Sequence, residues 1–271
     1  MNIYLAGGIT GNLIKDWKKL MELYFASGGQ GQGGLPCKQK DIPLDHLYIL
    51  ESYHYIVKQQ WMYPLIKQFK GFLLDSGAFT FMTSMKGESI DWDKYIINYG
   101  KFVKELDIEY FFELDIDSIV GIKEVERLRA LLEKTAGRQC IPVWHKSRGL
   151  DYWKKMCMEY DYVSIGGIVT QEIKRSEYEV FYPLLKIAKE NNCLVHALGF
   201  TNLKGMEKYR FHSVDSTSWL SGNKFGAVYF FTGKTMAKVT KKVGQRVKTN
   251  EVAHHNFNEW YKFSEYAQSN L

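Results

Sequence analysis

The sequence predicts an α/β fold with a mainly parallel sheet. The chain has 271 residues, and 45% of them are hydrophobic, which is enough to bury a substantial core. Short apolar or β-branched runs recur along the chain, and the segments between them have helical periodicity. This alternation is typical of parallel strands joined by helices. Because eight such runs are present, we expect a (β/α)8 barrel in preference to an open sheet.

The predicted strands are short runs of apolar and β-branched residues. In chain order they are Ile3–Ala6, Gly71–Leu74, Tyr110–Leu114, Cys140–Trp144, Tyr162–Ile165, Leu194–Leu198, His212–Val214 and Ala227–Phe231. The predicted helices are the intervening segments with a helical period, namely Leu13–Phe25, Leu47–Val57, Trp92–Glu105, Lys123–Lys134, Leu150–Met158, Glu177–Glu190 and Leu203–Lys208. No repeat or Pro-rich linker divides the chain. We therefore expect one barrel domain over residues 1–232 and a basic, partly helical extension over residues 233–271.

Several classes of protein do not fit this sequence. No apolar run approaches the roughly 18 to 20 residues that cross a bilayer, and the N-terminus lacks the features of a signal peptide, so we expect a cytoplasmic protein without membrane contact. The four cysteines are scattered without a CxxC pair, which argues against a zinc ribbon. The Gly-rich stretch 27–34 contains GxGxxG, but it follows a predicted helix. We expect it to be a loop and not a dinucleotide site.

Positive charge is concentrated near the C-terminus. Lys and Arg exceed Asp and Glu by 36 to 30 in the whole chain, but residues 216–250 contain no acidic residue. The basic residues there are Lys224, Lys234, Lys238, Lys241, Lys242, Arg246 and Lys248. Such a field attracts phosphates, because neutralising them releases condensed counterions. The alternative is a solvated basic surface that serves solubility.

Aspartates follow three of the predicted strands, at Asp75, Asp115 and Asp215. In barrel enzymes the C-terminal ends of the strands carry the chemistry. Carboxylates that converge there can bind a metal, act as acid and base, or attack an anomeric carbon. Each aspartate alone is also compatible with a turn or a helix cap, so their combination is what indicates a site.

Two histidines and several glycines complete the predicted site. His145 and His196 lie on separate strands and form no HxH pair, so we expect neither a metal ion nor another cofactor. We expect both histidines to contact the substrate. Gly166, Gly167 and Gly199 also lie at strand ends. Glycine lets a flat ligand approach the backbone, whose N–H groups can donate to a carbonyl oxygen on that ligand. A purine-like base fits both features.

Four motifs, taken in order, resemble those of the tRNA-guanine transglycosylase family. Asp75-Ser76-Gly77-Ala78-Phe79 resembles the family's DSGGF-type motif. Ser164-Ile165-Gly166-Gly167 and His196-Ala197-Leu198-Gly199 resemble its later IGG and HxxG segments. Val214-Asp215-Ser216-Thr217-Ser218-Trp219 resembles the strand-end DS motif that carries the nucleophilic aspartate. The match spans residues 73–222, about half of the chain.

The resemblance implies a TIM barrel that exchanges guanine in a polynucleotide for a 7-deazaguanine base. Asp215 would attack C1′ of the nucleoside and hold a covalent glycosyl ester, and Asp75 would be the acid and base. Asp115 would accept from the N1–H and exocyclic amine of the base. Phe79 would stack on the base, and the amides of Gly166 and Gly167 would reach its carbonyl oxygen.

The chain also departs from the tRNA enzymes of this family. They carry a CxCxxC…H zinc subdomain after the nucleophile, whereas no such cysteines follow Asp215 here. His145-Lys146 stands where they often have Gln-Gly, which leaves recognition of that base edge open. A short chain without the zinc module resembles the compact phage and bacterial relatives that put 7-deazaguanines into DNA. The resemblance therefore implies DNA and a free preQ0-like base as partners, in the host cytoplasm if the chain is phage-encoded.

The residues that we expect to contact nucleic acid are basic and lie near the C-terminus: Lys234, Lys238, Lys241, Lys242, Arg246 and Lys248. Three rival readings stay open at this point. The same exchange could take place on tRNA, the chain could be a non-catalytic nucleic-acid-binding barrel, or water could complete the reaction and leave an abasic product. The sequence is compatible with a homodimer but does not indicate one.

Overall fold

The structure is a computed structural model that describes residues 1–6, 42–78, 81, 90–200, 202–220, 226–240 and 249–271. Within these residues the chain has an α/β fold whose central sheet contains eight parallel strands in the order β4-β3-β2-β1-β8-β7-β6-β5. The strands are β1 (Asn2–Ala6), β2 (Tyr48–Ser52), β3 (Gly71–Asp75), β4 (Tyr110–Phe111), β5 (Val143–Trp144), β6 (Tyr162–Ile165), β7 (Leu194–Ala197) and β8 (Ser213–Ser216). The expected α/β class with a parallel sheet is thus confirmed.

Backbone hydrogen bonds connect the two ends of this strand order. Beyond the end of β4 and before the start of β5, Phe112 and Ile141 form a parallel bridge. The N–H of Ile141 donates to the carbonyl oxygen of Phe111 at 2.7 Å, and the N–H of Glu113 donates to that of Ile141 at 3.0 Å. This arrangement is compatible with a TIM-like barrel.

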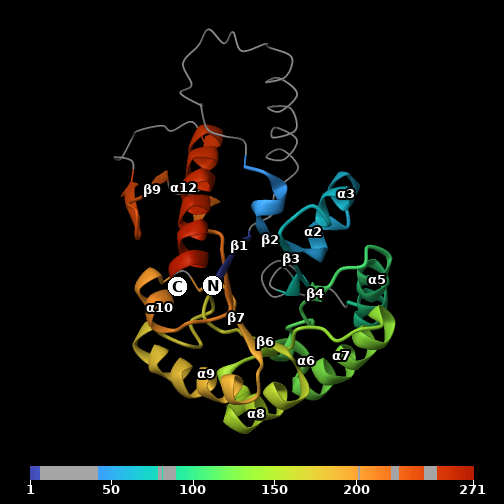
Figure 1. Ribbon diagram of the computed structural model, residues 1–271. Helices are drawn as coiled ribbons and strands as arrows, with labels where there is room; N and C mark the ends of the chain where they lie inside the picture. The colour runs from blue at the N-terminus through green and yellow to red at the C-terminus, as the bar shows by residue number, and fades with distance from the viewer. Residues whose placement is uncertain (7–41, 79–80, 82–89, 201, 221–225, 241–248) are drawn as a thin grey trace.

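The helices follow the strands and cover the sheet from outside. Figure 1 shows α5, α7, α8 and α9 as an arc around the strands. The described α-helices are α2 (Tyr53–Ile56), α3 (Tyr63–Ile66), α5 (Trp92–Glu105), α6 (Asp117–Val120), α7 (Ile122–Ala136), α8 (Gly149–Glu159), α9 (Phe181–Glu190), α10 (Leu203–Lys208) and α12 (Thr249–Asn270). The 3-10 helices are η1 (Leu44–His46), η2 (Gln60–Met62), η3 (Lys146–Arg148), η4 (Arg175–Val180) and η5 (Ser218–Leu220). None of the helices in these ranges has the length and apolar character of a membrane span.

Helix α5 illustrates how the sequence sets an element. It begins after Asp91, whose side chain accepts the N–H of Lys94 and caps the helix. Ile96, Tyr99 and Val103 recur at helical spacing and are fully buried. The hydroxyl of Tyr99 donates towards the carbonyl oxygens of Leu74 and Phe112, at 3.1 and 3.0 Å. The helix is thereby fastened to the neighbouring strand segments directly before Asp75 and Glu113.

One strand of the sheet lies where the sequence predicts a helix. Residues 47–57 have helical spacing of apolar residues, yet Tyr48–Ser52 forms β2 and only Tyr53–Ile56 is helical. The strand is buried on both faces, with Ile49 against the surrounding helices and Leu50 in the interior of the sheet. A strand of this kind reads as a continuous apolar run, so periodicity cannot separate it from a buried helix.

The predicted strand Ala227–Phe231 exists, but it does not belong to the parallel sheet. As β9 (Ala227–Phe231) it pairs antiparallel with β10 (Met236–Thr240). The proposed boundary at residue 232 therefore falls in the turn of a hairpin. The predicted helix Leu13–Phe25 and the Gly-rich stretch 27–34 lie outside the described residues.

Helix α12 covers the outer edge of β9, as Figure 1 shows by their position side by side. Asn256 Oδ1 accepts the N–H of Tyr229 at 2.9 Å, and Glu259 Oε2 accepts the N–H of Phe231 at 2.6 Å. Asn256 is fully buried and also donates to the carbonyl oxygen of Ala227 at 2.9 Å. Side chains of α12 thus form hydrogen bonds with backbone groups of β9 that could otherwise pair with another strand.

A small apolar cluster fills the interior of the sheet, separate from the larger core beneath the helices. It contains Tyr4, Leu50, Leu73, Phe112, Ile141, Val143 and Tyr162, with Tyr48 and Leu198 packed against it. These residues come from seven different strands or from positions next to them. Residues that lie two positions after a member of this cluster share its strand face, so at the strand ends they also point inwards.

Candidate functional site

The polar residues at the strand ends point towards the interior of the sheet. Side chains alternate along a strand, so residues two positions apart share a face. Leu73 and Val143 belong to the interior cluster, and Asp75 and His145 each follow one of them by two positions. Asp215 lies opposite Tyr4, another interior residue, where β8 pairs with β1. Because the strands are parallel, these side chains meet at one end of the sheet.

Asp75 is a half-buried acid with a raised pKa. Its Oδ2 accepts the N–H of Gly77 at 2.9 Å, in a turn where Gly77 has a φ of 87°. Burial raises the pKa of Asp75, the Gly77 N–H lowers it, and the charges of Asp215 and Asp115 raise it, to about 6. Asp75 therefore lies close enough to Asp115 and Asp215 for their charges to act on it. A pKa near neutrality suits a group that both gives and takes a proton.

Asp215 is 7% exposed and is held through one oxygen. Its Oδ1 accepts the N–H of Gly199 at 2.5 Å and lies 3.3 Å from His196 Nε2. Within the described part of the chain, no hydrogen bond to Oδ2 is found. One carboxylate oxygen of Asp215 is thus held by two hydrogen bonds, and its other oxygen has none among the described residues.

His196 is fully buried, which changes the role expected for it. Its Nδ1 lies 2.5 Å from Ser213 Oγ and its Nε2 faces Asp215, so both ring nitrogens bond to the protein. From its place at a strand end, His196 was expected to contact the substrate. The geometry favours a supporting role beneath Asp215, because the ring has no exposed edge for a ligand.

Asp115 forms an ion pair with His145. His145 Nε2 lies 2.8 Å from Asp115 Oδ1, and its Nδ1 lies 2.8 Å from Glu172 Oε2. Burial lowers the pKa of His145, but hydrogen bonds and charges from Asp115 and Glu172, with the charge of Asp117, raise it to about 9. His145 is therefore an imidazolium at neutral pH that donates to two carboxylates, and Asp115 is held in place by it.

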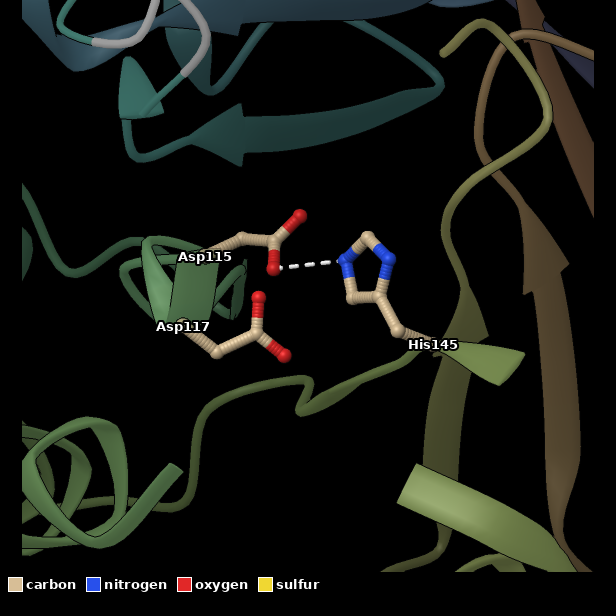
Figure 2. Close-up of side chains that lie close together, drawn as sticks. All are labelled: Asp115, Asp117 and His145. Atoms are coloured by element: carbon tan, nitrogen blue, oxygen red, sulfur yellow. Dashed lines mark hydrogen bonds and ion pairs between the residues drawn. The ribbon is translucent and has the colours of Figure 1, made fainter. Parts of the chain in front are cut away.

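Asp115, Asp117 and His145 also form a group whose donor atoms lie within 4.8 Å of one another. Figure 2 shows both aspartates reaching towards the imidazole, from the loop after β4 and the start of α6. Arg148 lies against the same acids, with Nε 3.0 Å from Asp117 Oδ2 and Nη2 3.8 Å from Asp115 Oδ1. A metal ion there would have to displace the His145 proton and compete with a guanidinium that is only 2% exposed.

Glu113 is a buried carboxylate that holds Arg148, the residue next to Asp115 and Asp117. It is fully buried, and its two oxygens contact Arg148 Nη1 at 3.0 Å and Arg129 Nη1 at 3.2 Å. It also accepts the N–H of Val143 at 2.8 Å. Burial raises the pKa of Glu113 while the two guanidinium groups lower it. The ion network therefore ties the end of β4 to β5 and to α7.

The three predicted glycines differ in what their amides do. The N–H of Gly166 donates to the carbonyl oxygen of Trp144 at 2.8 Å, and the N–H of Gly199 donates to Asp215. The expectation that the Gly166 amide reaches a base carbonyl is therefore wrong, because the β5–β6 ladder already uses it. Gly167 has a φ of 75°, which favours glycine there, and it remains a candidate.

Several predicted residues lie outside the site or outside the described chain. Phe79, Lys241, Lys242, Arg246 and Lys248 are not among the described residues. Lys234 and Lys238 are exposed on the β9–β10 hairpin. Five residues that contact the site were not predicted to belong to it: Glu113, Arg148, Tyr162, Glu172 and Ser213. Ser213 had a usable signal, because it precedes Asp215 by two positions on the same strand face, whereas Glu172 lies in the connection after β6 and Arg148 ends the three-residue helix η3.

A surface cavity of about 710 Å³ lies at the opposite end of the sheet. It is lined by the start of β7, by the residue before β8 and by α9, including Leu194, His212 and Lys189. The candidate site lies at the C-terminal ends of the strands, so this cavity is not part of it.

Comparisons with known proteins identify no family. No protein-family model matches the chain, and no curated protein matches it. Among solved structures, it is similar to the carboxyl transferase domain of Rhizobium etli pyruvate carboxylase determined with pyruvate, with 12% identity and a TM-score of 0.43. The match covers 83% of this chain and 42% of that one, so this chain spans less than half of its length. A similarity at this level carries no information about activity.

Proposed function

We propose that this protein is a guanine transglycosylase that exchanges guanine in DNA for a 7-deazaguanine base of the preQ0 type. The observation that carries the proposal is the relationship between Asp75 and Asp215. They lie 140 positions apart in the chain, yet their carboxylates interact at one end of the sheet, and Asp75 has a pKa of about 6. The motif resemblance to the tRNA-guanine transglycosylase family supplies the reaction.

Two carboxylates with different surroundings support a double displacement. Asp215 Oδ2 attacks C1′ and forms the C1′–O bond as the C1′–N9 bond breaks. The proton of Asp75 goes to the departing guanine. The incoming base then gives its N9 proton to the Asp75 carboxylate and attacks C1′, and the electron pair of the C1′–O bond returns to Asp215. No oxidant, metal or water is consumed.

Asp115 is the proposed reader of the base. The imidazolium of His145 holds its Oδ1, so Oδ2 is assigned to the N1–H and exocyclic amine of guanine. Two hydrogen bonds to a fixed carboxylate would reject bases that lack these donors. The Gly167 N–H is assigned to the base carbonyl, and Phe79 remains the proposed stacking residue.

The proposed scaffold is a TIM (β/α)8 barrel, closed between β4 and β5, without a zinc subdomain. The proposed DNA contacts begin on the β9–β10 hairpin, a two-stranded ribbon that carries Lys234 and Lys238 on exposed positions. A ribbon of this kind fits the DNA major groove, and its charge would favour the phosphates. Such contacts would offset the few kcal/mol needed to flip the target base out of the stack.

The test is incorporation of labelled guanine into duplex DNA or tRNA by the purified full chain. We expect label in DNA, and a loss of about a thousandfold or more with Asp215→Asn. Asp151→Asn is the matched control, because Asp151 lies on α8 and its side chain is 97% exposed. A covalent adduct of DNA on the wild type, detected by mass spectrometry, would support Asp215 as the nucleophile.

Each rival function predicts a different outcome. Label that enters only tRNA would contradict DNA as the substrate and keep the chemistry. Abasic sites without label would indicate a hydrolase. Binding of DNA that is the same for the wild type and Asp215→Asn, with no exchange by either, would leave a non-catalytic binding protein.

A further inference from the structure

A chain of buried polar side chains lies behind Asp215. The hydroxyl of Tyr162 contacts Ser213 Oγ, which lies 2.5 Å from His196 Nδ1. His196 Nε2 in turn lies 3.3 Å from Asp215 Oδ1. We propose that His196 is a positioning residue for Asp215, held as a single tautomer by Ser213 and Tyr162. This inference rests on the proposed function for its chemical meaning, but its geometry can be tested separately.

The register of β6, β7 and β8 brings the residues of this hydrogen-bonded series together. His196 lies opposite Ser213 where β7 pairs with β8, and opposite Ser164 where β6 pairs with β7. Ser213 and Asp215 share the inward face of β8, two residues apart. Tyr162 is two residues before Ser164, so its side chain also points inwards and can reach Ser213. His196 and Ser213 have no exposed surface, and Tyr162 is only 7% exposed.

The protonation of Tyr162 determines which atom donates in each hydrogen bond between Tyr162 and Asp215. Burial raises the pKa of Tyr162 well above its usual range, so its hydroxyl is protonated and can donate to Ser213. Ser213 then donates its own proton to His196 Nδ1, which must be the lone-pair nitrogen. The proton of a neutral His196 consequently lies on Nε2 and faces Asp215. With the donors assigned in this way, every polar group in the series from Tyr162 to Asp215 has a hydrogen-bond partner.

The rest of the His196 ring is enclosed by aromatic residues. The ring of Phe112 lies 5.3 Å from it and that of Tyr4 lies 6.1 Å from it, measured between centroids. Because His196 is also fully buried, these contacts restrict rotation of the imidazole away from Asp215. The ring is therefore fixed in both orientation and tautomer, which is what a positioning group needs.

The consequence concerns the glycosyl ester formed on Asp215. With Oδ1 held by the N–H groups of Gly199 and His196, Oδ2 is the atom that bonds to C1′. When the C1′–Oδ2 bond breaks in the second step, its electron pair returns to the carboxylate. Donors already aimed at Oδ1 stabilise the charge that develops there. Loss of the His196 donor should therefore slow breakdown of the ester more than its formation.

The geometric test is the tautomer of His196, measured by long-range ¹H–¹⁵N NMR of the histidine side chains in the full chain. We expect the Nε2–H form in the wild type. In Ser213→Ala the donor to Nδ1 is absent and only Asp215 still favours the proton on Nε2, so we expect a second population with a proton on Nδ1 to appear beside the Nε2–H form. The matched control is Ser164→Ala, because Ser164 is also buried in the interior next to His196, and its hydroxyl has no partner among the described residues.

The kinetic test is exchange by the same two variants and by Tyr162→Phe. We expect Ser213→Ala to lower kcat about tenfold with little change in KM, and to accumulate the covalent adduct. Tyr162→Phe should shift kcat in the same direction, and Ser164→Ala should match the wild type. His196→Gln should retain more activity than His196→Phe, because its amide can still donate.

The outcomes separate this inference from the proposed function. A wild type that shows Nδ1–H or a doubly protonated ring would overturn the positioning role, whatever the activity. Equal kcat and equal adduct levels in Ser213→Ala and Ser164→Ala would overturn it too. A wild type that has the expected tautomer but exchanges no base would instead contradict the proposed function.

Discussion

The backbone N–H of Gly199 donates to Oδ1 of Asp215 at 2.5 Å, linking the turn after β7 to the end of β8. Gly199 has a φ of 68°, and a Cβ atom there would lie 2.2 Å from Val169 Cγ2. Both the backbone conformation and the neighbouring side chain therefore require glycine. The orientation of Asp215, the proposed nucleophile, therefore depends on a turn in which position 199 must be glycine.

Gly199→Ala should lower both stability and exchange. The strained φ and the contact with Val169 should reduce the free energy of unfolding by about 1–3 kcal/mol, and displacement of the N–H should impair Asp215. Urea unfolding and guanine exchange measure the two effects. Gly137→Ala is the control, because Gly137 also has a positive φ of 78° but an added Cβ would meet nothing within 4 Å. Equal losses in the two variants would show that Val169 and Asp215 do not matter.

Stability should depend on the protonation of Asp75. Its folded pKa of about 6 exceeds the ordinary value of 3.8, so the folded state binds the proton more tightly. The stabilisation is fully present below about pH 4 and is lost as pH rises through 6, by up to about 3 kcal/mol. Asp75→Asn removes this dependence. Urea unfolding of both proteins between pH 4 and 7 should therefore give curves that diverge in this window, and parallel curves would contradict the raised pKa.

Glu113→Gln should destabilise the fold strongly. The substitution keeps the shape of the side chain but leaves Arg129 and Arg148 without their shared buried carboxylate, at a cost of about 2–4 kcal/mol. Thermal or urea unfolding measures the change. Glu124→Gln removes a carboxylate from an exposed pair with Arg127 on α7 and should have little effect. A small change at Glu113 would mean that the ion network does not hold β4 and β5.

Replacing Lys234 and Lys238 by Gln should weaken DNA binding and flatten its dependence on salt. The slope of log K against log salt should fall by about one for each phosphate contact that is lost. Fluorescence anisotropy with duplex DNA at several salt concentrations provides the measurement. Replacing Lys101 and Lys104 on α5 removes the same charge elsewhere. An identical slope for both double variants would exclude the hairpin from the DNA interface.

The bounds of some strands and helices were predictable, because the apolar residues in them follow the period of a strand or of a helix. Tyr162–Ile165 and Trp92–Glu105 have the bounds that the sequence predicts. The alternation that buries Leu73 also turns Asp75 inwards, where the charges of Asp115 and Asp215 raise its pKa. By contrast, Tyr48–Ser52 is buried on both faces, and its apolar spacing could not distinguish a strand from a helix.

The partners of the site residues could not be predicted from local sequence. Glu172 reaches His145 from the connection between β6 and η4, and Arg148 reaches Asp115 from the end of the three-residue helix η3. Neither segment has an apolar period that would indicate where its side chains point. The bonding of His196 depends on the register of three strands, which only the assembled sheet defines. The Gly166 amide illustrates the same limit, because a glycine at a strand end gives no sign of whether the ladder continues through it.

The covering of β9 by α12 has a consequence for self-association. An unpaired strand edge can recruit the same strand of another molecule and seed aggregates. Asn256 and Glu259 bond to outward-facing N–H groups of β9, so that edge offers little to an incoming chain. The remaining edge, along β10, carries the charge of Lys238. The hairpin can therefore stand exposed at high concentration with a reduced tendency to polymerise.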